Sequence, residues 1–204
     1  GQDVGGEGGL NEALPQINID QVYSEYGLTG KDIHIAVLDT GIDTDHIDLS
    51  DSVESQACFA DFCPNGADNA EDDNGHGTHV SGIISSAGVS SSAGVARNTR
   101  IHAIKVLDSS NGFSSSSIII EALDHIINNL PQVNLINMSL GTFDRFESFC
   151  DQQNIYTRAF ATAINTLRDR GTLSFVASMN NASSNSISAP ACISNAISVG
   201  AVWD

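Results

Sequence analysis

Basic residues are scarce in this sequence. Eight lysines and arginines stand against 25 aspartates and glutamates in 204 residues, which gives a net charge of −17. A field of this sign repels nucleic acids and anionic membrane surfaces, so we exclude both as partners. Two interpretations of the acidity stay open: the solvated surface of a secreted, salt-adapted protein, or a protein that holds calcium.

Long apolar runs are also absent. The longest run inside a helical pattern is Ile118–Ile120, far below the roughly 18 residues of a membrane-spanning helix. The chain starts at Gly1 without an initiator methionine and shows no signal-peptide pattern, so we expect a processed or recombinant form.

The cysteines are few, and they indicate an oxidising compartment. Four are present, Cys58, Cys63, Cys150 and Cys192. Such a set allows three pairings, and the sequence alone does not choose among them. We predict disulfides Cys58–Cys63 and Cys150–Cys192, because one disulfide within a short loop and one between distant loops suit a secreted protein. The alternative is a set of reduced, buried thiols.

Strand and helix patterns alternate along most of the chain. Compact apolar runs predict strands at 33–38, 100–107, 133–138, 172–177 and 196–202. Helical spacing and end signals predict helices at 18–26, from Gly75 onward, at 114–130 and at 154–170. The alternation predicts an α/β fold with a mainly parallel β-sheet and helices on both faces. We expect one domain over 16–204, preceded by a flexible N-terminal arm over 1–15.

Two polar residues follow predicted strands. Asp39 comes directly after the run at 33–38, and Asn180 lies just past the run at 172–177. Functional groups of parallel sheets collect at such carboxyl ends of strands. Taken alone, Asp39 also fits an Asx turn. In the same way, His76, at the start of the helix predicted from Gly75, fits a histidine whose hydrogen bonds are satisfied within the structure.

Longer segments around these residues resemble the subtilase family of serine proteases. The three strongest are Ile35-Ala-Val-Leu-Asp-Thr-Gly, Asp72-Asp-Asn-Gly-His-Gly-Thr-His-Val-Ser-Gly and Ile136-Asn-Met-Ser-Leu-Gly. Weaker matches follow in the family's order, at Gly94-Val-Ala with Ala103-Ile-Lys-Val-Leu and at Ile197-Ser-Val-Gly-Ala. The resemblance implies a subtilisin-like three-layer sandwich and a serine endopeptidase that acts on polypeptide substrates.

The resemblance also implies catalytic roles for three residues. His76 is similar to the family's general base, and Asp39 to the aspartate that orients it. Asn180 resembles the side-chain donor to the oxyanion. Met179 stands where the family usually has glycine, so we expect it to narrow the specificity pocket or to shift Asn180. His79 matches a structural position.

Two segments match the edges that flank the substrate peptide in the family. They are Ser110, Asn111 and Gly112, and Ser139, Leu140 and Gly141. Ala177, in the Asn180 segment, is a further expected substrate contact. An extended peptide can pair with such edges through its backbone. An ordinary glycine turn is the alternative for Asn111–Gly112.

A structural calcium ion is a further expectation, although the chemistry of the family requires no cofactor. Asp48 matches a position that ligates calcium in many members, and calcium takes hard oxygen ligands. The loop Ala87–Gly94, however, lacks the asparagine-rich pattern that usually completes that site. The acidic loop Asp61–Asp73 is a second candidate.

The family's nucleophile lies in a Gly-Thr-Ser segment, and no such segment occurs in this chain. We therefore expect a secreted endopeptidase whose domain is incomplete here, with the serine in a C-terminal remainder of the same domain. A propeptide is a further candidate partner. The 204-residue chain alone is predicted to be inactive and poorly stable, because the central serine helix covers apolar side chains.

Other functional classes fit less well. A non-catalytic fragment or binding module is the main alternative. A metal hydrolase at His76 and His79 lacks the glutamate of the zincin helix. Dinucleotide binding fails because the glycines of Gly5–Gly9 neither follow a strand nor open a helix.

Overall fold

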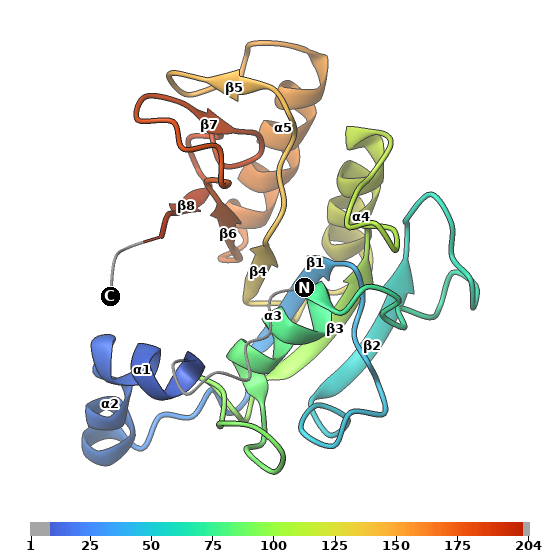
Figure 1. The fold of residues 1–204 in the computed structure, drawn as a ribbon. Coiled ribbons are helices and arrows are strands. Elements are labelled where there is room, and N and C mark those ends of the chain that lie inside the picture. The colour runs from blue at the N-terminus through green and yellow to red at the C-terminus, as the bar shows by residue number, and fades with distance from the viewer. Residues whose placement is uncertain (1–8, 202–204) are drawn as a thin grey trace.

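A six-stranded β-sheet forms the centre of the structure, a computed structural model that describes residues 9–201 (Figure 1). Its order is β2-β3-β1-β4-β6-β8, and each pair of neighbours is parallel. The strands are β1 (His34–Asp39), β2 (Val53–Cys58), β3 (Arg100–Lys105), β4 (Leu135–Met138), β6 (Leu173–Ala177) and β8 (Ile197–Val199). The predicted parallel sheet is confirmed.

Strand β1 lies where the strand order changes direction. The chain first builds β2 and β3 on one side of β1 and then adds β4, β6 and β8 on the other. In open parallel sheets, ligands bind outside the carboxyl ends of the strands at such a switch point. Asp39 is the last residue of β1 and therefore lies at this position.

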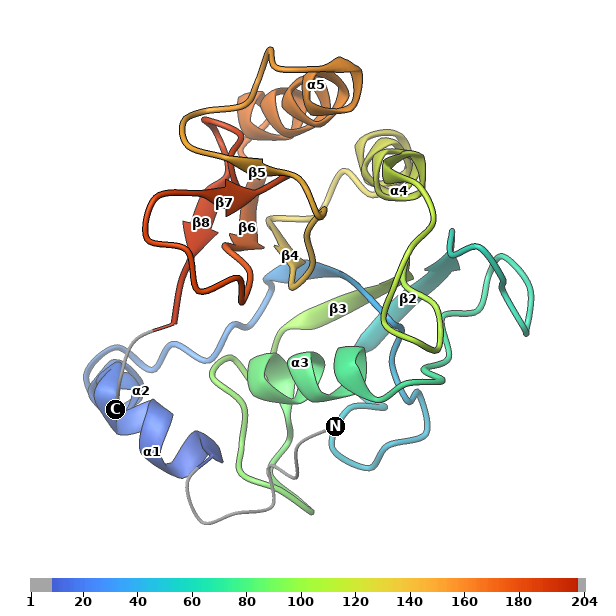
Figure 2. The ribbon, with the colours of Figure 1, turned by 45° about the horizontal axis from the view of Figure 1, so that its top comes forward.

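Helices cover both faces of the sheet, as predicted (Figure 2). Ala36 and Leu38 of β1 share an apolar cluster with α4 (Ser116–Asn129) and α5 (Ile155–Asp169). Ile35 and Val37 point to the other face, where they pack with residues of α3 (His76–Ser85). Both faces of β1 are thus buried, which explains the nearly continuous apolar run in its sequence.

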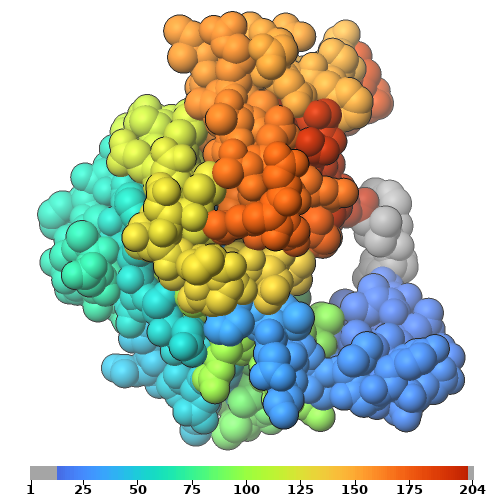
Figure 3. All heavy atoms as spheres, turned by 180° about the vertical axis from the view of Figure 1, so that it is seen from behind, coloured from blue at the N-terminus to red at the C-terminus, as the bar shows by residue number. Residues whose placement is uncertain are grey.

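The N-terminal region differs from the expectation. We expected a flexible arm over 1–15, but helix α1 covers Gly9–Gln16; residues 1–8 lie outside the described part. Helix α2 (Ile19–Tyr26) is close to the predicted helix at 18–26. Its Tyr23 hydroxyl donates to the backbone oxygen of Val95 at 2.6 Å, which ties the helix to the body of the domain. Seen from behind, the blue N-terminal residues form a lobe beside the rest of the molecule (Figure 3).

Both predicted disulfides are present. Cys58–Cys63 closes a short loop after β2, and Cys150–Cys192 joins segments 42 residues apart. The second disulfide lies close in sequence to a two-stranded antiparallel sheet of β5 (Arg145–Phe146) and β7 (Ile187–Ser188). Within residues 9–201, no helix has the length and apolar character needed to cross a membrane.

Among the described residues 9–201, one part of the sheet is left uncovered. The residues of β4, β6 and β8 that share a face with Ile35 and Val37 are only partly buried; they are Leu135, Asn137, Leu173, Phe175, Ala177, Ile197 and Val199. On the opposite face, Ile136 and Val176 are fully buried against the helices. Helix α3 therefore covers the β1 and β3 part of its face, whereas the β6 and β8 part stays open to solvent.

Candidate active site

Asp39 and His76 form a hydrogen-bonded pair. Nδ1 of His76 lies 2.7 Å from Oδ1 of Asp39. Asp39 is fully buried, whereas 35% of the His76 side chain is exposed. A carboxylate at Nδ1 holds the proton on that nitrogen and leaves Nε2 free to accept another. The hydrogen bond to Asp39 raises the pKa of His76 above 6.5, and this effect outweighs the opposing effect of burial.

The start of helix α3 places His76 in the pair. Gly75 precedes the helix with φ 100°, a left-handed conformation that suits glycine. The carboxylate of Asp72 accepts hydrogen bonds from the backbone nitrogens of Gly75 and Thr78, both at 2.9 Å, and so caps the first turn. Burial raises the pKa of Asp72, but these hydrogen bonds and those from Asn74 and the Thr78 hydroxyl outweigh it and lower the pKa to about 2.

Thr40 connects the end of the strand to the start of the helix. Its hydroxyl donates to Oδ1 of Asp72 at 2.8 Å and accepts the backbone N–H of Gly77 at 2.8 Å. Gly77 must be a glycine, because a Cβ there would lie 2.1 Å from the backbone oxygen of Gly41. This close approach brings the imidazole of His76 to the carboxylate of Asp39.

The simpler interpretations of the two residues do not account for this geometry. Asp39 does accept the backbone N–H of Thr40 at 2.7 Å, as an Asx-type contact would, but the same oxygen also binds His76. His76 is not a satisfied core residue, since part of its ring is open to solvent. His79 lies exposed on the same helix.

Asn180 and the residues expected to contact substrate follow neighbouring strands. β4 leads to Ser139, Leu140 and Gly141, and β6 contains Ala177 and leads to Asn180. Because β4 and β6 are adjacent and parallel, these segments emerge at the same edge of the sheet. Asn180 is exposed there.

Met179, directly before Asn180, contacts the segment that follows β4. Its φ of 72° is left-handed, a strained conformation for a methionine. A Cβ placed on Gly141 would lie 2.7 Å from Cγ and 2.9 Å from Sδ of Met179. The methionine side chain therefore packs directly over Gly141, in space that a glycine at position 179 would leave empty.

The segment Ser110–Gly112 is a turn held by Asp108. Oδ1 of Asp108 accepts the backbone N–H groups of Ser110 at 2.8 Å and Gly112 at 3.0 Å, and Asn111 has φ 61°. The side-chain amide of Asn74 donates to the backbone oxygen of Ser109 at 3.0 Å, which ties this turn to the loop before His76. The segment is thus a glycine-containing turn that also borders the site.

Asp48 does not fit a calcium site. Its buried carboxylate accepts hydrogen bonds from the backbone N–H groups of Val89, Ser90 and Ser91 and from both serine hydroxyls. Burial raises its pKa, but these donors outweigh it and lower the pKa to about 2. Calcium needs oxygen ligands around it, whereas this loop directs hydrogen-bond donors at the carboxylate. In the described part of the chain, including the loop Asp61–Asp73, no group of three or more His, Cys, Asp or Glu side chains could hold a metal ion.

The sequence analysis missed four residues that build the site: Thr40, Asp72, Asp73 and Lys105. Lys105 gave a usable signal, because a lysine inside an apolar strand pattern needs a buried partner. Its Nζ atom lies 2.6 Å from Oδ1 of Asp73.

The chain was compared with known proteins. The sequence profile of the subtilase family (Peptidase_S8) matches residues 30–204. The chain is 38% identical over 176 residues to Subtilisin Savinase of Lederbergia lenta, with 86% of this chain and 57% of that protein aligned. It is 38% identical over 176 residues to an alkaline protease of Alkalihalobacillus alcalophilus, with 86% of this chain and 40% of that protein aligned.

Among solved structures, Sphericase matches with a TM-score of 0.72 and 32% sequence identity, over 91% of this chain and 61% of that structure. The chain thus spans between 40% and 61% of the length of these three proteins. Two of the three strongest subtilase-like segments in the sequence carry Asp39 and His76, which the structure brings together, and the chain belongs to the subtilase family.

Proposed function

We propose that the protein containing this chain is a secreted serine endopeptidase, in which Asp39 and His76 act with a serine that lies outside these 204 residues. The observation that carries the proposal is the 2.7 Å hydrogen bond between His76 and the buried Asp39, in the chain order Asp then His. The resemblance of both segments to the subtilase family supports it further.

In the proposed mechanism, Nε2 of His76 removes the proton from the serine hydroxyl as its oxygen attacks the carbonyl carbon of the scissile peptide bond. The carbonyl oxygen becomes an oxyanion, which the side-chain amide of Asn180 stabilises by donating a hydrogen bond. His76 then passes its proton to the leaving amine, and the C–N bond breaks. A water molecule then attacks the carbonyl carbon of the acyl-enzyme and gives a proton to His76. The ester C–O bond breaks, and His76 returns the proton to the serine oxygen as the carboxylic acid product leaves. Asp39 stabilises the imidazolium in both steps.

The open face of the sheet supports a serine in a further segment. Phe175 and Ala177 of β6 and Val199 of β8 lie on this face and stay partly exposed, with Val199 at 49%. Full burial of an exposed Val or Phe side chain stabilises a fold by about 1.5–3 kcal/mol, and covering these partly exposed side chains contributes a part of that. We propose that a segment with the nucleophile packs on this face, next to the edge that carries Asp39. The chain alone is then inactive.

The substrate is proposed to be an extended polypeptide. Its backbone would pair with Ser110–Gly112 on one side and with Ser139–Gly141 on the other, in the manner of an added strand. The small residues in both segments allow the peptide to approach closely. Secretion is supported by the two disulfides, because such bonds persist in oxidising compartments.

Hydrolysis of a peptide substrate by the intact protein tests the proposal. We expect turnover in the wild type and a loss of about 10³-fold or more in His76→Ala. His79→Ala is the matched control, because this histidine lies on the same helix and is exposed. Equal rates in His76→Ala and the wild type would overturn the proposal and favour a non-catalytic binding module.

A further inference from the structure

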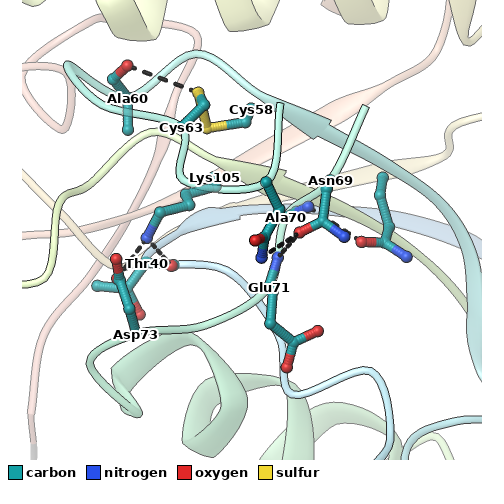
Figure 4. The surroundings of a disulfide bond; sticks show 11 residues. Thr40, Cys58, Ala60, Cys63, Asn69, Ala70, Glu71, Asp73 and Lys105 are labelled. Carbon is teal, nitrogen blue, oxygen red and sulfur yellow. Dashed lines mark hydrogen bonds and ion pairs between the residues drawn. A yellow bond between two sulfur atoms is a disulfide. The ribbon is translucent and has the colours of Figure 1, made fainter. Parts of the chain in front are cut away.

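Lys105 is the last residue of β3 and is completely buried. A lysine in this position is costly unless its ammonium is paired and hydrogen-bonded. The strand register places it beside Asp39 of β1. Its Nζ atom lies 2.6 Å from Oδ1 of Asp73 and 2.6 Å from the backbone oxygen of Thr40, as the dashed lines in Figure 4 show.

These two partners belong to the two segments that carry the catalytic pair. Thr40 directly follows Asp39, and Asp73 lies in the loop that leads to His76. One buried ammonium therefore bridges the strand end and the loop. The same strand end is also held by Val106, the residue after β3, whose backbone N–H donates to the backbone oxygen of Asp39 at 2.8 Å.

The disulfide loop 58–63 packs against Lys105 from the other side (Figure 4). The backbone N–H groups of Phe59 and Ala60 donate to the backbone oxygen of Lys105 at 2.8 and 3.2 Å. Cys58 is paired with Lys105 in the sheet. The side chain of Lys105 is 1% exposed, and an ion pair is stronger where water is excluded.

The two side chains of the ion pair differ in their exposure to solvent. The Asp73 side chain is 34% exposed and can be solvated without Lys105, whereas the side chain of Lys105 is 1% exposed. Asp72, the neighbour of Asp73, binds the first turn of α3 and the Thr40 hydroxyl instead. The two adjacent aspartates thus fix the loop at two different points.

We propose that Lys105 is a positioning residue, which through Asp73 and Thr40 keeps His76 at hydrogen-bonding distance from Asp39. The inference rests on the proposed function for its catalytic consequence. A displacement of about 1 Å in such a pair is enough to reduce turnover about 100-fold.

The test uses the intact protease with Lys105→Met, Asp73→Asn and Asp73→Glu. The concentration of active sites is titrated with a fluorophosphonate, so that kcat refers to folded enzyme only. We expect kcat to fall about 10- to 100-fold in Lys105→Met and Asp73→Asn, with KM within about twofold of the wild type. Asp73→Glu keeps the charge and is expected to recover most of the kcat lost in Asp73→Asn.

The matched control is the ion pair at the other end of the same strand. Arg100 of β3 and Glu54 of β2 lie 3.9 Å apart and are about half exposed. Arg100→Met and Glu54→Gln are expected to leave kcat unchanged. If Lys105→Met does not fold, the comparison of Asp73→Asn with Asp73→Glu decides. Wild-type kcat per titrated site in Asp73→Asn, or in a folded Lys105→Met, would overturn the inference.

A second readout separates this inference from the proposed function. The proton on Nδ1 of His76 gives a downfield NMR resonance when it is hydrogen-bonded to Asp39. We expect this resonance in the wild type, its loss in Asp73→Asn and its retention in Glu54→Gln. If the wild type shows the resonance but neither turnover nor titration, the proposed function fails. If Asp73→Asn also retains it, the positioning role fails.

Discussion

The Nδ1 atom of His76 lies 2.7 Å from Oδ1 of Asp39, although 37 residues separate them in sequence. The contact forms because a parallel strand ends where helix α3 begins, with Gly77 packed against the backbone of Gly41. The fold thus places an imidazole with one fixed proton at the switch point of the sheet.

Asp39→Asn tests the role of the carboxylate in the pair. Asparagine has nearly the same shape, but its amide removes the charge and favours the wrong tautomer of His76. We expect kcat to fall by about four orders of magnitude, with little change in KM. Asp124→Asn, on the exposed side of α4, is the control. A loss of less than tenfold in Asp39→Asn would contradict the assigned role.

The pH dependence of activity follows from the raised pKa of His76. The base must be neutral to accept the proton of the serine. Because the hydrogen bond to Asp39, together with the charges of Asp39 and Asp72, raises this pKa above 6.5, kcat/KM is expected to fall as pH drops through a value above 6.5. A kcat/KM profile measures this limb directly. A limb centred well below 6.5 would show that His76 is not the group being titrated.

Met179→Gly tests whether the methionine limits the specificity pocket. Its side chain packs over Gly141, in a segment proposed to bind substrate. We expect the wild type to prefer small side chains at the residue before the scissile bond. The variant is expected to gain about tenfold or more in kcat/KM for phenylalanine relative to alanine at that position.

The control for this specificity change is Met138→Leu, because Met138 is a second methionine that is fully buried in the core. Volume-conserving exchanges of this kind are usually tolerated. An unchanged preference in an active Met179→Gly enzyme would show that another residue sets the pocket.

Asp48 is predicted to hold its loop without a metal ion. The donors of Val89, Ser90 and Ser91 saturate its carboxylate, so a chelator should leave hydrogen exchange of these amides unchanged. Asp48→Asn should accelerate it. Since the folded pKa is about 2, the stabilisation is present above pH 3.8 and is lost as pH falls towards 2. Slower exchange of these amides on addition of calcium would contradict the prediction.

His102 makes folding stability depend on pH. Burial, together with the neighbouring His34, lowers its pKa to about 4. Ser55 and His34 both contact its ring, at 2.6 and 2.9 Å. In the unfolded chain, His102 takes up a proton as pH falls through 6.5, whereas in the folded chain it does so only near pH 4. The free energy of unfolding is therefore highest above pH 6.5 and decreases by up to about 3 kcal/mol as pH falls from 6.5 to about 4.

Denaturant unfolding of the intact protein at several pH values measures this effect. His102→Gln keeps a hydrogen-bonding side chain that does not titrate, so its stability is expected to change less over that range. His79→Gln, in an exposed position, should behave like the wild type. Parallel pH profiles for His102→Gln and the wild type would show that His102 is not the source.

Sequence patterns predicted the elements in which hydrophobic periodicity is strong. The apolar run at 33–38 became β1, and the helical spacing at 114–130 became α4. Strand β2 was missed because Glu54, Ser55 and Gln56 interrupt its apolar pattern at the edge of the sheet. Helix α1 was missed because the glycines before it suggested an arm.

The candidate site was predictable where short segments carry the chemistry. Asp39 and His76 lie in such segments, and the structure brings them together. The contact between Lys105 and Asp73 was not predictable, because it depends on the register of β3 and on the path of a loop 32 residues away in sequence. The sequence suggested calcium at Asp48 because this aspartate matches the family's position, whereas the hydrogen-bond donors of the surrounding loop were not visible in the pattern.

The most direct test is to treat the intact protein with a fluorophosphonate probe and then to measure its mass by mass spectrometry under denaturing conditions. We predict one probe adduct, on a serine outside the 204 residues of this chain, and no adduct when His76 is replaced by alanine. An unlabelled wild type, or an adduct on a serine within these residues, would contradict the proposal that Asp39 and His76 activate a nucleophile supplied by a further segment.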